Sequence, residues 1–171
     1  FSFICNALHA QHFVRRELTA ELEIPWEIQC SNDGNLWISE SQGRIVKVNP
    51  TTGIGKQIFK AKDYSDAHPS EKSNLCHKPS PGSGCLGLAL HPDFNTDSPY
   101  VFLLYSYLKN PLTTPQTRFK IVKIELNKNR DSAIAVWDLV LNLPTGFDHL
   151  GGRILTIKEK GNYYLFVSTG D

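Results

Sequence analysis

The feature that most constrains the fold is a recurring set of short strands separated by turn residues. Apolar or alternating runs end repeatedly in Asn, Asp, Gly or Pro, and little of the chain has helical periodicity. This pattern predicts antiparallel strands joined by hairpin turns. The expected strands form three sets: 26–30, 36–39, 44–48 and 56–60; 86–90, 100–107, 119–126 and 135–143; 153–157 and 163–168.

The sets also resemble one another. The second strand of each set ends in an apolar run followed by a serine, and these serines, Ser39, Ser106 and Ser168, are 67 and 62 residues apart. Repeated four-stranded antiparallel sheets are typical of β-propeller blades rather than of a sandwich. We therefore predict an all-β chain of about two and a half four-stranded antiparallel blades, which is an incomplete propeller.

The strand sets also predict the domain organisation. Propellers usually close with about four blades or more, so we expect the rest of the ring to come from further sequence or from another chain. Residues 1–11 are expected to be an N-terminal arm or the remnant of a secretion signal. The partial propeller spans 12–171, with a closing strand at 12–22, blade 1 at about 25–61, blade 2 at about 84–143 and half of blade 3 at about 149–171.

Charge and hydropathy argue against two kinds of partner. The chain has 18 Lys and Arg against 17 Asp and Glu, and no basic run follows the spacing of a phosphate backbone, so nucleic acid is not an expected partner. No apolar stretch approaches the ~20 residues that a helix needs to cross a bilayer. We therefore expect no transmembrane segment.

Four cysteines, Cys5, Cys30, Cys76 and Cys85, have neither the spacing of a zinc site nor that of a CxxC pair. Cys76 and Cys85 bracket a loop rich in Pro, Ser and Gly, so a disulfide between them is expected in an oxidising compartment. Cys5 and Cys30 form a weaker second pair. Free buried thiols are the alternative for all four.

A short stretch, 148–153, concentrates groups that carry chemistry. It places Asp148, His149, Gly151, Gly152 and Arg153 at the point where a polar loop becomes an apolar strand. The two glycines leave room for a flat group to approach the backbone. In a propeller such junctions, which also include 25–26 and 83–85, surround the mouth of the central channel.

His149 is expected to work with Asp171. The start of the first strand of an antiparallel hairpin lies beside the end of the second strand, which brings both residues to one end of the third sheet. An imidazole near its usual pKa accepts a proton, and a carboxylate on its other nitrogen fixes the tautomer. The alternative is that His149 caps a turn and Asp171 only ends a strand.

Several sequence blocks are similar to those of the soluble quinoprotein glucose and aldose sugar dehydrogenases, over about residues 12–171. The resemblance implies the N-terminal part of a six-bladed propeller, with pyrroloquinoline quinone (PQQ) and calcium as cofactors. It also implies an aldose substrate that is oxidised at its anomeric carbon, an electron acceptor and a periplasmic or secreted location. The blocks are 25–28, 33–37, 43–45, 85–94, 148–153 and 168–171.

The resemblance implies roles for individual residues. His149 matches the histidine that takes the proton of the C1 hydroxyl while a hydride passes to the quinone, and Asp171 matches the aspartate that orients this histidine. Asp148 matches a polar residue near the cofactor and the sugar, and Gly151, Gly152 and Arg153 share its block. His91, which follows an inner strand at a Pro-Asp turn, is interpreted as structural.

One departure from the family concerns a cofactor contact, which is either absent here or supplied differently. Where the family has a glutamine that contacts the quinone, this chain has, at about the same position, Gly82. The family's basic residues that clamp the quinone's carboxylates, and its calcium ligands, lie in later blades, so no metal ligand is assigned here. A tricarboxylate needs countercharge to bind tightly. We therefore interpret the polypeptide as truncated and expect it to be inactive alone. Its partner could be a second copy, in a homodimer, or the complementing remainder of the ring.

Two other functions stay open. One is a non-catalytic binding propeller similar to the hedgehog-interacting proteins, which the missing glutamine favours and the pair His149 and Asp171 disfavours. The other is a calcium-dependent propeller lactonase. Such enzymes place several carboxylates and asparagines around a central ion, and the three junctions supply too few.

Overall fold

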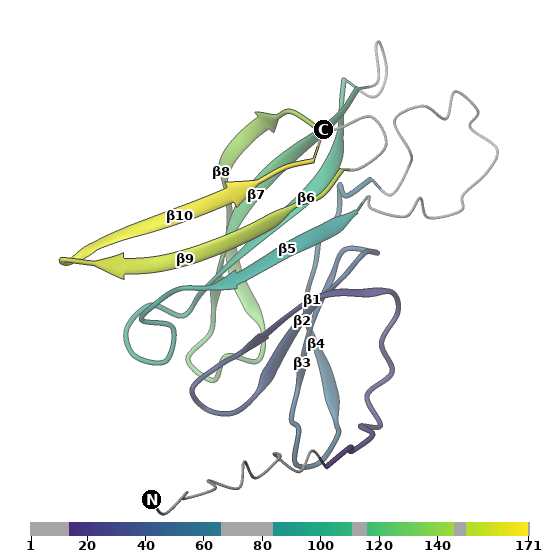
Figure 1. The fold of residues 1–171 in the computed structure, drawn as a ribbon, viewed down its shortest axis with the longest axis vertical. Coiled ribbons are helices and arrows are strands. Elements are labelled where there is room, and N and C mark those ends of the chain that lie inside the picture. The colour runs from purple at the N-terminus through teal and green to yellow at the C-terminus, as the bar shows by residue number, and fades with distance from the viewer. Residues whose placement is uncertain (1–13, 66–83, 111–115, 146–149, 171) are drawn as a thin grey trace, which may run out of the picture.

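The computed structural model describes residues 14–65, 84–110, 116–145 and 150–170, and every regular element within these ranges is a β-strand (Figure 1). All strand pairs are antiparallel and form three sheets. Two sheets have four strands in sequential order and the third is a hairpin. The predicted all-β class and the incomplete propeller are confirmed.

The first sheet contains β1 (Pro25–Cys30), β2 (Leu36–Glu40), β3 (Arg44–Val48) and β4 (Gly55–Lys60). Its turns occur where the sequence predicts them. Gly34 has a φ of 79°, a left-handed conformation that costs glycine little, and it ends the turn between β1 and β2. Between β3 and β4 the side chain of Asn49 accepts a hydrogen bond from the amide of Thr51 at 2.8 Å, which is an Asx-type turn.

The second and third sheets repeat this order. The second contains β5 (Cys85–Leu90), β6 (Tyr100–Lys109), β7 (Gln116–Leu126) and β8 (Ala133–Leu143). The third contains β9 (Arg153–Glu159) and β10 (Asn162–Ser168). Each strand lies within a few residues of its predicted range.

The first strands of the three sheets lie side by side, with β5 next to both β1 and β9 (Figure 1). β5 is buried over almost its whole length, as expected for a strand covered on both faces. One core cluster joins the first two sheets around Trp37 and Leu88, and a second joins the second sheet to Leu150 and Ile154. The sheets therefore stack around a common line of inner strands, as propeller blades do.

Within the predicted closing strand at 12–22, the structure has no regular element over 14–22. The last blade, with which that strand is expected to pair, is not among the described residues, so the closing role stays a prediction. Leu18, Ala20 and Leu22 instead pack on a cluster at the face of the first sheet. Apolar residues do alternate along this stretch, and their side chains pack against the first sheet. A strand also needs a neighbouring strand edge for its backbone groups, and no described strand pairs with this stretch.

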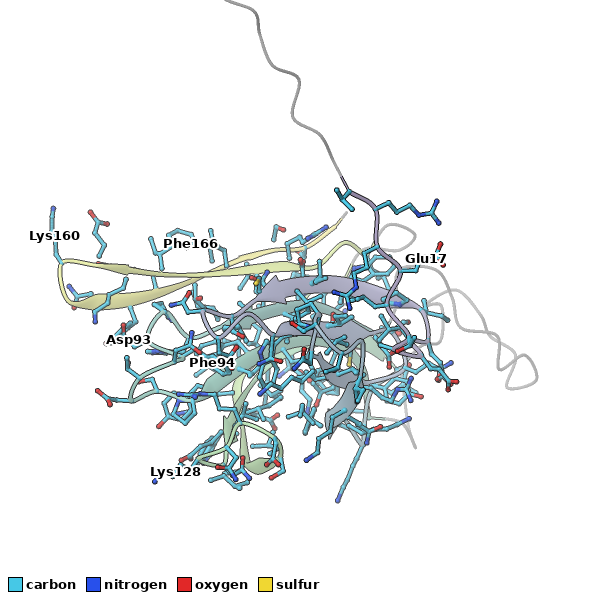
Figure 2. All side chains as sticks on the ribbon, turned by 90° about the horizontal axis from the view of Figure 1, so that it is seen from below. Glu17, Asp93, Phe94, Lys128, Lys160 and Phe166 are labelled. Carbon is cyan, nitrogen blue, oxygen red and sulfur yellow. The ribbon has the colours of Figure 1, made fainter. Side chains whose placement is uncertain are left out.

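One face of the β9–β10 hairpin is apolar and exposed. Leu155, Tyr164 and Phe166 are 58%, 45% and 53% exposed, and Phe166 lies on the outer side of the hairpin in Figure 2. Neighbouring sheets of a propeller cover such faces. The uncovered face agrees with a ring of which this chain supplies only part.

Candidate functional site

The three sheets have equivalent junctions at the start of their first strands. In each sheet, an amide on the second strand or just past its end donates to the carbonyl that precedes the first strand. The N···O distances are 3.0 Å for Ser41 to Ile24, 3.0 Å for Ser106 to Gly84 and 2.8 Å for Gly170 to Leu150. The described residues at or beside the three predicted junctions thus share one hydrogen-bond arrangement.

Neighbouring junctions also contact each other. The amide of Cys85 in the second sheet donates to the carbonyl of Ser41 in the first, at 3.0 Å. Gly84 has a φ of 92°, and a Cβ there would lie 2.1 Å from the same carbonyl oxygen. Only glycine allows this approach, so the first two sheets are fixed to each other at this end.

The predicted base and its carboxylate, His149 and Asp171, lie outside the described residues, as do Asp148, Gly82 and Cys76. Their chain neighbours are described and lie together. Leu150 is 1% exposed within the second core cluster, and its carbonyl accepts the hydrogen bond from Gly170. The two segments that lead to His149 and Asp171 are therefore joined at one end of the hairpin.

Gly151 and Gly152 have a structural reason to be glycine. Their φ angles are 62° and 112°. A Cβ on Gly151 would lie 2.7 Å from the amide nitrogen of Gly170, and one on Gly152 would lie 3.0 Å from Cδ1 of Leu86. A Cβ at either position would thus meet the protein itself, and the predicted approach of a flat ligand to their backbone stays a prediction.

Arg153 forms an ion pair that sequence reasoning missed. Its guanidinium Nη1 donates to Oε2 of Glu27, a carboxylate on β1 whose side chain is only 8% exposed. The signal for Glu27 was its position as the one charged residue in the predicted strand 26–30, within the resemblance block 25–28. Charged residues are rarely buried unless they are paired, so a charged residue in a predicted strand indicates an ion-pair partner elsewhere in the chain.

His91 has the structural contacts that its turn position predicts. Its Nδ1 accepts a hydrogen bond from the amide of Asp93 at 3.1 Å, and its ring lies 4.6 Å from that of Tyr163. Burial lowers the pKa of His91, and this effect outweighs the charge of Asp93, which raises it. Asp93 also binds Lys158 of β9 at 2.7 Å, so this turn joins the second sheet to the hairpin near the opposite end (Figure 2).

Metal ligands do not cluster among the described residues, and a hollow on the first sheet lies away from the junctions. No three His, Cys, Asp or Glu side chains within the described ranges gather to hold a metal ion. A shallow hollow of about 420 Å³ lies on the outer part of the first sheet, and none of its residues belongs to the three junctions. It is lined by Thr19, Ala20, Glu21, Arg44, Val46, Gly53, Ile54, Gly55 and Gln57.

Two cysteines fall within the described residues. Cys30 is exposed and Cys85 has no exposed surface, and neither forms a disulfide with another described residue. Burial raises the pKa of the Cys85 thiol. Its predicted disulfide partner Cys76 lies outside the described residues, so that pairing stays a prediction. In the part of the chain that is described, no helix is long and apolar enough to span a membrane.

Repeated antiparallel sheets, with adjacent first strands and equivalent junctions at one end, define part of a β-propeller. The family model described as Glucose / Sorbosone dehydrogenase matches residues 22–171. The chain therefore belongs to the glucose/sorbosone dehydrogenase family.

Individual relatives agree with this assignment. The chain is 26% identical over 165 residues to quinoprotein glucose dehydrogenase B of Acinetobacter calcoaceticus, covering 94% of this chain and 32% of that protein. The apo form of the soluble aldose sugar dehydrogenase of Escherichia coli superposes with a TM-score of 0.64 at 18% identity, covering 87% of this chain and 38% of that chain.

A second solved structure, an oxidoreductase (glucose dehydrogenase) of Thermus thermophilus, superposes with a TM-score of 0.54 at 25% identity. That match covers 81% of this chain and 35% of the other chain. This chain thus spans about a third of the length of the relatives that it matches.

Proposed function

We propose that the chain is part of a PQQ-dependent oxidoreductase that converts the C1 hydroxyl of an aldose into a lactone, with His149 as the general base. Family membership supports an oxidoreductase of the sugar dehydrogenase type. The names of the relatives, glucose and aldose sugar dehydrogenases, support the substrate class. The resemblance of the 148–153 block supports the choice of base.

The observation that carries the proposal is the hydrogen bond from the amide of Gly170 to the carbonyl of Leu150, at 2.8 Å. Asp171 follows Gly170 directly and His149 precedes Leu150 directly. Two residues that are 22 positions apart in sequence therefore stand next to backbone groups in hydrogen-bond contact. A base and its orienting carboxylate must lie close together, and the contact between their chain neighbours supports this.

In this proposal His149 accepts the hydroxyl proton of the sugar. Removal of that proton makes loss of the C1 hydride favourable, and the two losses together convert the hemiacetal carbon into the lactone carbonyl. Asp171 holds the imidazole in the tautomer whose free nitrogen faces the sugar and stabilises the imidazolium that forms. The pair supplies proton transfer and orientation, which is worth roughly 10²- to 10⁴-fold in rate.

In this proposal the quinone, when bound, would accept the hydride. The described residues do not fit it on their own, because Arg153, the one cation at the Gly151–Gly152 junction, is paired with Glu27. Carboxylates of a quinone need unpaired cations or amides. We therefore assign the contacts to PQQ and calcium to residues outside this chain, and we derive no step through either cofactor. A periplasmic or secreted location fits this assignment.

Reconstitution tests the proposal. The full-length protein is incubated with PQQ and CaCl₂, and reduction of a dye by glucose and other aldoses is followed by absorbance. We expect aldose-dependent dye reduction by the full-length protein and none by residues 1–171 alone. Quinone binding without dye reduction would favour a binding propeller instead, and hydrolysis of a lactone without quinone would favour a calcium-dependent hydrolase.

A further inference from the structure

A closed ring of contacts joins the three inner strands close to the candidate site. On β1, the amide of Glu27 donates to Oγ of Ser39 at 3.2 Å. The same hydroxyl donates to the carbonyl of Leu86 on β5 at 2.9 Å. Leu86 in turn packs on Gly152, just before β9, and Arg153 returns to Glu27 through the ion pair.

Among the links of this ring, the ion pair joins the residues that lie farthest apart in sequence, 126 positions. β5 lies beside both β1 and β9, so the bond from Arg153 to Glu27 joins the two strands that flank it. β5 and β9 also approach each other closely near the ion pair. A Cβ on Gly87 would lie 3.1 Å from the amide nitrogen of Ile154 and 3.2 Å from the carbonyl oxygen of Gly152. The start of β9 is thus held from two directions.

The two partners of the ion pair differ in burial. The Glu27 side chain is 8% exposed and that of Arg153 is 68% exposed. The fixed partner is therefore the carboxylate, whose Oε1 also accepts a hydrogen bond from the amide of Ile28 at 3.3 Å, while the guanidinium reaches it from the exposed side. A buried carboxylate without its cation is costly, so Arg153 is strongly favoured in this one position.

We infer that Glu27 is a positioning residue for the proposed sugar oxidation. Through Arg153 it fixes the Gly151–Gly152 turn, and with it the hydrogen bond from Gly170 to Leu150 that joins the two chain segments beside His149 and Asp171. The effect of Glu27 on sugar oxidation rests on the proposed function. Its effect on the Gly151–Gly152 turn does not rest on that function and is measured separately.

The first measurement is hydrogen exchange at the Gly170 amide in the full-length protein without cofactor. Glu27→Gln keeps the size of the side chain and removes its charge. We expect the Gly170 amide to exchange about tenfold faster in this variant, since local opening at the turn becomes easier. Glu159→Gln, at the far end of β9, is the matched control and should leave this amide unchanged.

The second measurement is a double-mutant cycle in the reconstituted enzyme. Glu27→Gln and Arg153→Gln should each lower kcat about tenfold with KM within about twofold, because orientation of the base affects the chemical step more than sugar binding. The double variant should be no worse than either single variant, because both act through one ion pair. Arg153→Lys, at an exposed position, provides a milder variant if the others fold poorly.

The outcomes separate the two proposals. Unchanged Gly170 exchange in folded Glu27→Gln protein, or additive effects of the two substitutions on kcat, would overturn the inference. Faster exchange at the Gly170 amide with an unaltered kcat would show that Glu27 fixes the turn but does not position the catalytic groups, which would also overturn the inference. If the wild-type protein oxidised no sugar, the proposed function would fail, and the exchange rates would still decide whether Glu27 fixes the turn.

Discussion

The amide of Gly170 donates a hydrogen bond to the carbonyl oxygen of Leu150, with 2.8 Å between the nitrogen and the oxygen. Leu150 is buried in the core cluster that the second sheet shares with β9, so its carbonyl is a fixed acceptor. Gly170 lies two residues beyond the end of β10. The bond therefore extends the pairing of the hairpin past its last strand residues and keeps its two ends together.

Replacement of Gly151 by alanine should break this contact. The residue has a φ of 62°, and the new Cβ would lie 2.7 Å from the amide nitrogen of Gly170. Gly161 in the β9–β10 turn has a φ of 82° but has nothing within 4 Å of its Cβ position. We expect Gly151→Ala to lower the free energy of unfolding by ~1 kcal/mol more than Gly161→Ala, which has only the left-handed φ to oppose it. Urea unfolding of both variants measures the difference, and equal effects would show that the contact is unimportant.

Replacement of His149 by glutamine in the full-length protein should remove the proposed base. Glutamine keeps a polar side chain of similar length but does not accept the hydroxyl proton. We expect kcat for aldose oxidation to fall by roughly 10²- to 10⁴-fold, with the folded structure retained. His91→Gln is the matched control, because His91 packs in a turn against Tyr163 and should keep a near-normal kcat. Survival of most of the activity in His149→Gln would assign the proton transfer to another group.

The strands were predictable because each is bounded by turn residues whose backbone preferences are local. Gly34 and Asn49 form turns through their own φ angle or side chain, independently of tertiary context. The stretch 14–22 has a similar alternation, yet its apolar side chains pack on the first sheet without strand pairing. Side-chain periodicity alone does not tell whether a neighbouring strand edge exists.

The candidate site was predictable only in part, for a related reason. Hairpin geometry alone brings together the segments that end at Leu150 and Gly170. Glu27 pairs with Arg153 across 126 sequence positions, and that proximity depends on how three sheets stack. Likewise, no local pattern shows that Gly170 and Leu86 lie at the Cβ positions of Gly151 and Gly152, so this structural reason for the two glycines was not predictable.

A buried lysine provides a test of pH-dependent stability. Lys120 on β7 is 8% exposed and binds Asp63 at 2.7 Å and Asp138 at 3.0 Å, while the hydroxyl of Tyr105 donates to Asp63 at 2.8 Å. Burial alone would raise the pKa of Asp63, but the hydrogen bonds from Lys120 and Tyr105, together with the lysine charge, hold it below its usual value.

The sign of the effect follows from the lowered pKa. The Asp63 carboxylate stabilises the fold fully above its unfolded-state pKa of roughly 4, and this contribution is lost as the pH falls through the lower folded-state value. We expect Asp63→Asn to cost about 1 kcal/mol near pH 7, because the side chain is 55% exposed, and much less in strong acid. Denaturant midpoints across this range measure it. In a Lys120→Met background the same substitution should have little effect, and an undiminished cost there would exclude the ion pair as its cause.

The two described cysteines should differ sharply in reactivity. Cys30 is exposed, whereas Cys85 has no exposed surface and burial raises the pKa of its thiol, so little thiolate is available to react. We expect iodoacetamide to modify Cys30 in the native protein and Cys85 only after unfolding, as read by peptide mass spectrometry. If Cys85 resisted modification in denaturant and reacted only after a reductant was added, it would be in a disulfide, as predicted with Cys76. Rapid native modification of Cys85 would mean instead that the contact between the first two sheets opens readily, because Cys85 packs in the core cluster that joins them.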